Sequence, residues 1–136
     1  MSAITIRGLD HVVLRTSDAN GMVRFYVDVL GCSVERSIDV GLIQLRAGHS
    51  MVDIVPTNSE LGRRGGGPPN RMAPNMDHLC LRVEPFDETA IRAHLSAHGI
   101  EAGKTSTRYG AEGNGPPIYI SDPDGNTVEL KGPPDK

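Results

Sequence analysis

The chain has 136 residues, of which 38% are hydrophobic and 23% are charged, so it fits one soluble globular domain and excludes two large domains or a disordered chain. A net charge of −3, only 4% aromatic residues and the lack of an apolar run near the roughly 18 residues of a membrane span argue against nucleic-acid and membrane partners. Because the N-terminus lacks a secretory signal's apolar stretch and two cysteines cannot form a disulfide framework, we expect a cytoplasmic protein.

The first half of the chain reads as a strand, a helix and three further strands. The opening strand follows Asp10 in the segment DHVVLR. Apolar residues at helical spacing predict a helix over 19–30, with Ser17 or Asp18 as its cap and Gly31 at its end. Short runs bounded by turn residues then predict strands over 33–38, 42–47 and 51–55.

The second half repeats this order. The segment DHLCLR begins at Asp77, and a helix is predicted over 87–98 with Gly99 at its end. Strands are predicted over 100–104, 118–121 and 127–131. The halves, about 8–56 and 76–131, are joined by residues 57–75, whose three consecutive glycines and several prolines predict a flexible linker without regular structure.

Alternation along the strands places polar side chains together on one face. One face of every strand is apolar and is expected to pack against the helices. The opposite face holds two histidines and two carboxylates at matching places in the two halves. Two imidazoles and a carboxylate can hold a divalent cation and leave positions open for a substrate, so this face predicts a metal site. Cys80 shares this face in the sequence pattern, so it either lines the site or is a small core residue; we favour the core position, as for Cys32.

Over nearly its whole length the sequence resembles the vicinal oxygen chelate superfamily. This superfamily includes glyoxalase I, methylmalonyl-CoA epimerase, fosfomycin-resistance proteins and extradiol dioxygenases. The resemblance is carried by LDHVVLRTSD, FYVDVLG, DHLCLRV and, most specifically, IYISDPDGNTVEL. It implies an α+β fold in which two βαβββ modules form a half-open barrel around a metal-binding cup, with the helices on the outer face. The whole chain, 1–136, is then a single glyoxalase-like domain.

The resemblance also implies roles for particular residues. Matching the family's positions, the metal ligands are His11, Asp53, His78 and Glu129, with Glu129 and Asp53 also the candidates for moving a proton. Asp53 departs from the pattern, because family members commonly carry Glu, Gln or His there; it either reaches the metal or remains a free base. Further side chains of the polar face are candidates for binding the substrate, although a solvated rim explains each equally well: Arg15, Gln44, Arg82, Tyr119 and Lys131.

Three functions remain open at this point. The leading hypothesis is a metal-dependent lyase or isomerase of glyoxalase type, acting on a small oxygenated, anionic substrate. The alternatives are an iron(II)-dependent ring-cleaving dioxygenase and a metal-free, drug-sequestering resistance protein of the bleomycin-resistance type. The sequence implies one divalent ion per site without distinguishing Ni, Zn, Mn, Fe or Mg. The exposed sheet edges of such modules and the habit of the family predict a homodimer.

Overall fold

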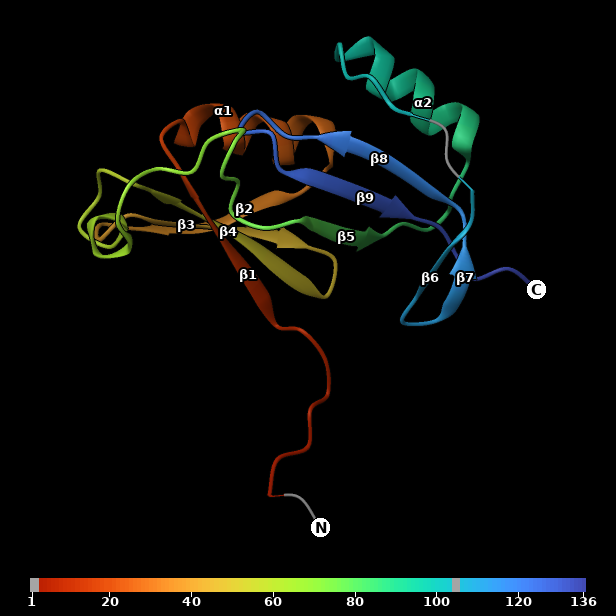
Figure 1. Ribbon diagram of the computed structural model, residues 1–136, viewed down its shortest axis with the longest axis horizontal. Helices are drawn as coiled ribbons and strands as arrows, with labels where there is room; N and C mark the ends of the chain where they lie inside the picture. Colours follow the sequence, from red (N-terminus) through yellow and green to blue (C-terminus); the bar gives the residue numbers. More distant parts are fainter. Residues whose placement is uncertain (1–2, 104–105) are drawn as a thin grey trace. The chain divides into compact units, whose positions relative to one another are not determined.

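The computed structural model describes residues 3–103 and 106–136. The chain divides into two compact units, Met1–Pro68 and Pro69–Lys136. Each unit contains a mixed sheet in which the first strand runs parallel to the last (Figure 1). The duplicated plan expected from the sequence is therefore present, and each unit is a βαβββ-like module. In the described part of the chain, no helix has the length and apolar character needed to cross a membrane.

The first unit is built on a four-stranded sheet in the order β1-β4-β3-β2. Strand β1 is parallel to β4, whereas β3 is antiparallel to both β4 and β2. The predicted strand over 33–38 is confirmed residue for residue, as is the one over 42–47. The elements are β1 His11–Thr16, α1 Ala19–Arg24, η1 Phe25–Val29, β2 Ser33–Ile38, β3 Leu42–Ala47, β4 Ser50–Pro56 and η2 Gly62–Gly65.

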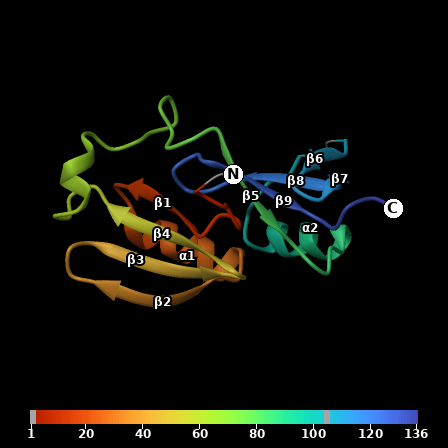
Figure 2. The same cartoon turned by 90° about the horizontal axis from the view of Figure 1, so that it is seen from below.

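The predicted helix over 19–30 forms, but its second half is a π-helix. Asp18 is the cap, since its Oδ1 accepts from the backbone N of Gly21 at 3.0 Å. Gly31 ends the helix at a φ of +79°, a conformation that glycine adopts without strain. The helix lies on one face of the sheet (Figure 2), where Tyr26 and Leu14 are fully buried in the core.

The segment after β4 is more structured than the sequence predicted. Residues 62–65 form the short 3-10 helix η2. The Arg15 guanidinium on β1 donates to the backbone carbonyl oxygens of Gly62, Gly66 and Gly67 at 2.9, 2.8 and 2.9 Å. The expectation of a linker without regular structure was thus wrong for this part, because one side chain satisfies three carbonyls that the glycine-rich sequence leaves without partners of their own.

The second unit has a three-stranded sheet in the order β5-β9-β8 and a separate hairpin, β6-β7. Its helix α2 begins after Asp87, whose side chain caps it by accepting from the backbone N of Ala90, and ends before Gly99, which has a φ of +72°. The last predicted strand, 127–131, is confirmed as β9. The elements are β5 His78–Arg82, α2 Glu88–Ala97, β6 Arg108–Gly110, β7 Gly113–Gly115, β8 Pro117–Ser121 and β9 Thr127–Lys131.

The strand predicted over 100–104 does not form over 100–103, and Lys104 lies outside the described residues. The Arg92 guanidinium on α2 donates to the carbonyl oxygens of Ala102 and Gly103, each at 2.9 Å. These carbonyl oxygens accept hydrogen bonds from a helix side chain and not from a neighbouring strand, so the segment passes along α2. The β6-β7 hairpin follows it in the chain and supplies strands that the sequence pattern did not reveal.

The turn between β8 and β9 fixes the start of the last strand. Asp122 Oδ1 accepts from the backbone N of Asp124 and of Asn126, at 3.0 and 2.9 Å, and Asp122 Oδ2 accepts from the Asn126 amide at 2.9 Å. Gly125 occupies the turn with a φ of +83°. Because the turn is tied at several points, the register that carries Glu129 into the sheet is well specified.

Candidate metal and substrate site

The two units place a histidine and a carboxylate in the same relative register. In the first unit His11 on β1 pairs with Met51 on β4, and Asp53 lies two residues further along. In the second unit His78 on β5 pairs with Thr127 on β9, and Glu129 again lies two residues further along. Because side chains two apart share a face of a strand, each histidine lies on the same face as its carboxylate.

In the second unit this face brings His78 and Glu129 close together. His78 Nε2 is 3.5 Å from Glu129 Oε1. The same carboxylate oxygen accepts from the Tyr119 hydroxyl at 2.9 Å, and the Glu129 side chain is only 6% exposed. Burial, followed by the hydrogen bond to Glu129, raises the pKa of Tyr119, so its hydroxyl keeps its proton at neutral pH.

In the first unit the carboxylate of Asp53 is almost completely buried, at 1% exposure. Its Oδ2 accepts from the Gln44 amide nitrogen at 3.1 Å. Its Oδ1 has no hydrogen-bond partner among the described residues. A buried carboxylate oxygen without a donor is costly, so Asp53 is suited to receiving a cation or a donor from a ligand.

Each histidine is held by the aspartate that precedes it. Asp10 Oδ1 lies 2.7 Å from Nδ1 of His11, and Asp77 Oδ2 lies 2.6 Å from Nδ1 of His78. The hydrogen bond to Asp10 also raises the pKa of His11. A carboxylate at Nδ1 favours the tautomer whose Nε2 lone pair is available to a metal, as in carboxylate–histidine–zinc arrangements. Our sequence reasoning did not assign Asp10 or Asp77 a role, although the repeated Asp-His pair was visible.

These donors fit a divalent cation in chemical type. The four predicted ligands offer two imidazole nitrogens and two carboxylates, and the structure gathers them as two pairs, one per unit. Within either unit as described, no three His, Cys, Asp or Glu side chains form a set that could hold an ion.

A pocket of about 430 Å³ lies over the first pair. Its lining includes His11 and Asp53 at the predicted metal site, together with Gln44. Apolar side chains of β1, β3 and β4 form much of the remainder, and the segment around η2 contributes a further wall. The first unit alone thus provides an open pocket beside two of the predicted ligands.

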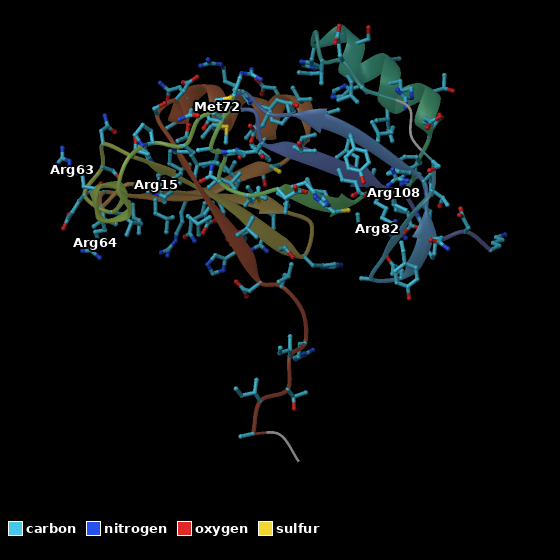
Figure 3. All side chains as sticks on the ribbon, viewed as in Figure 1. Arg15, Arg63, Arg64, Met72, Arg82 and Arg108 are labelled. Carbon is cyan, nitrogen blue, oxygen red and sulfur yellow. The ribbon has the colours of Figure 1, made fainter. Side chains whose placement is uncertain are left out.

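The predicted substrate-binding residues lie in different surroundings. Gln44 donates to Asp53 and the Tyr119 hydroxyl donates to Glu129, so each contacts a candidate metal ligand. The three basic residues bond to their own units: Arg15 to the η2 segment, Arg82 Nε to Glu112 at 2.7 Å, and Lys131 Nζ to the Gly113 carbonyl at 3.0 Å. Figure 3 labels two of them, Arg15 and Arg82, and shows each within its own unit. Their substrate contacts stay a prediction.

The expectation that Cys80 is a core residue was wrong, whereas Cys32 is buried as expected. Cys80 is exposed on the same face as Glu129, directly opposite it in the register of β5 and β9. Partial burial of its sulfur, followed by the charge of Glu129 and a hydrogen bond to it, raises the pKa of Cys80 to about 11. Cys80 therefore reports on the charge of Glu129.

We expect slow alkylation of Cys80 at pH 8 in the metal-free protein. With a pKa of about 11, the thiolate is about 100-fold scarcer than at the ordinary value of 9.0. In a Cys32→Ser background, Glu129→Gln removes two of the causes and should speed iodoacetamide labelling by about 10-fold. Mass spectrometry at several pH values measures the rate, with the exposed Glu101→Gln as control. Rapid labelling of Cys80 at pH 8 in the Cys32→Ser protein that keeps Glu129 would contradict the raised pKa of Cys80.

Comparison with known proteins identifies the family. The model described as "Glyoxalase/Bleomycin resistance protein/Dioxygenase superfamily" matches residues 8–130. The chain belongs to this superfamily. This glyoxalase-superfamily chain is 28% identical over 129 residues to the virulence protein STM3117 of Salmonella typhimurium, covering 90% of this chain and 81% of that protein. It is 30% identical over 128 residues to the glyoxalase domain-containing protein RDO1 of Mycosarcoma maydis, covering 93% and 69%.

Solved structures show the same fold. The crystal structure of STM3117 superposes with a TM-score of 0.80 at 27% identity, covering 96% of this chain and 99% of that one. A lactoylglutathione lyase from Agrobacterium tumefaciens matches with a TM-score of 0.66 at 19% identity, covering 93% and 94%. The second likeness concerns the fold alone. The glyoxalase-like architecture expected from the sequence is therefore confirmed at the level of its modules.

Proposed function

We propose that this glyoxalase-superfamily protein is a metal-dependent lyase or isomerase acting on a small oxygenated, anionic substrate chelated by one divalent cation. The observation that carries the proposal is the repetition, in both units, of an Asp–His–carboxylate arrangement at the same register. The proposal includes a half-open barrel in which the two pairs share an ion, within one chain or across a homodimer.

In this proposal His11, His78 and Glu129 hold the cation, and Asp53 is either the fourth ligand or a free base. A bound divalent cation would polarise two adjacent oxygens of the substrate. Asp10 and Asp77 keep the imidazoles in the binding tautomer. Tyr119, whose hydroxyl keeps its proton, donates to Glu129 Oε1 and fixes this carboxylate beside the substrate. A carboxylate of this kind can accept a proton at one substrate atom and return it at the next.

Metal loading followed by a comparison of reactions tests the proposal. The protein is purified without added metal, analysed for its elements, and reloaded separately with Ni, Zn, Mn, Mg or Fe(II). We expect one ion per predicted site and turnover of a small substrate with adjacent oxygens, for which the hemithioacetal of methylglyoxal and glutathione and the epoxide fosfomycin with a thiol are the first probes. Failure to bind any of these ions would overturn the proposal.

A ring-cleaving dioxygenase is the second candidate, because His11, His78 and Glu129 make up the two-histidine, one-carboxylate set used by non-haem iron(II) enzymes. This candidate predicts oxygen consumption with catechols that depends on ferrous iron and is lost in air. Activity with a redox-inert ion such as Zn or Mg excludes it. A protein that binds a drug without metal or turnover would instead be a sequestering protein.

A further inference from the structure

The pocket of the first unit continues past the predicted ligands to the segment around η2. Along β1, its lining runs from His11 through Val13 to Arg15. The segment around η2 contributes Leu61, Arg64 and Gly65. Four residues of strand correspond to about 13 Å. The pocket therefore has two ends: one beside His11 and Asp53, and another beneath η2.

The η2 wall is built into the unit. Leu61 N donates to the Val40 carbonyl at 2.9 Å, and Arg15 bonds three carbonyls of the following glycines. A Cβ at Gly62 would lie 1.9 Å from the Pro56 carbonyl oxygen, and one at Gly65 would lie 2.4 Å from Arg15 Nε. Glycine at these two positions lets the segment approach the sheet closely, so the wall is part of the pocket before a ligand arrives.

The chemistry of this second end is apolar with one available cation. The side chains of Leu42, Val55 and Leu61 line this end, and Val13, which pairs with Asp53 in the register, lies between the two ends. The Arg15 guanidinium is engaged with the η2 segment. Arg64 also lines the pocket, and its side chain makes no hydrogen bond or ion pair within residues 3–103 and 106–136. Figure 3 shows Arg63 and Arg64 leaving the short helix in different directions, and only Arg64 borders the pocket.

We propose that Arg64 determines substrate specificity by binding an anionic group, such as a carboxylate, at the far end of an elongated substrate with an apolar body. This inference rests on the proposed function, because the reacting oxygens would then lie at the end of the pocket marked by His11 and Asp53. The apolar walls bind the body through burial of apolar surface. The planar guanidinium binds the carboxylate with two parallel hydrogen bonds.

Binding of a matched pair of probes to metal-free protein tests the role of Arg64. The probes are 4-phenylbutyrate and its uncharged amide, titrated by ligand-observed NMR at pH 8. We expect the acid to bind about 10-fold more tightly than the amide, and Arg64→Gln to abolish this preference while the amide binds as before. Arg63→Gln is the control, since it removes the same charge one residue away from the pocket lining.

Equal binding of acid and amide, absence of binding by either probe, or equal losses in both variants would overturn the assignment. The last outcome would show general attraction by a basic segment and no defined contact. Because the probes are titrated into metal-free protein, the result does not depend on whether the proposed metal-dependent reaction occurs. A protein that prefers the acid through Arg64 yet never binds a cation would retain the specificity site and refute the metal-dependent reaction.

Discussion

His78→Ala is expected to reduce the affinity for a divalent metal by at least about 10-fold. Nε2 of His78 lies 3.5 Å from Glu129 Oε1, and Asp77 holds its Nδ1, so the imidazole is oriented as a ligand. Removing a residue that only orients a metal ligand already lowers metal affinity by roughly 10- to 100-fold. Removing the ligand itself lowers the affinity by at least as much. Competition with a chromophoric chelator measures the affinity, and elemental analysis of the purified variant measures the metal content.

His49→Ala is the matched control, because His49 is exposed in the turn between β3 and β4. This control variant should keep the metal content and affinity of the unmodified protein. Unchanged metal binding in His78→Ala would remove this histidine from the ligand set and, with it, the main support for the proposed function. If His78→Ala lost metal binding because it misfolds, its circular dichroism spectrum would be altered. An unaltered spectrum would attribute the loss of metal binding to the missing ligand.

The sequence predicted the elements that depend on local patterns. Short strand-like runs bounded by turn residues predicted β2, β3 and β9 to the residue, and Gly31 and Gly99 marked the helix ends because both adopt positive φ. The internal repeat predicted that the same relation between strands would occur twice. Each of these features is determined by residues close together in the chain.

Features that depend on one distant side chain were missed. Arg15 donates hydrogen bonds to the η2 segment, about 50 residues away along the chain. Arg92 donates to carbonyl oxygens of a segment that the sequence predicted to be a strand. The environment of Cys80 depends on Glu129 in the adjacent strand, so alternation alone could not distinguish a core cysteine from one beside a buried carboxylate. The sequence therefore identified the candidate ligands, while the contacts that orient them required the structure.

Asp53→Asn is expected to raise the free energy of unfolding of the metal-free protein by about 1 kcal/mol while weakening its metal binding. The carboxylate is 1% exposed, and its Oδ1 has no partner among the described residues. Asparagine keeps an oxygen to accept from the Gln44 amide, as Asp53 Oδ2 does at 3.1 Å, and removes a buried charge. Urea unfolding of both proteins after treatment with a chelator measures the difference in stability.

Glu129→Gln provides the contrast, because this carboxylate already has partners. Its Oε1 accepts from Tyr119 and lies beside His78, so loss of the charge should lower the free energy of unfolding by about 1 kcal/mol. Asp53 Oδ1 has no partner among the described residues and therefore costs stability when no ligand is bound, whereas Glu129, whose Oε1 already accepts from Tyr119, contributes to stability with or without a metal. If Asp53→Asn instead destabilised the protein and left metal affinity unchanged, Asp53 would be a structural residue bonded to Gln44, and the fourth ligand position would belong to the substrate or to water.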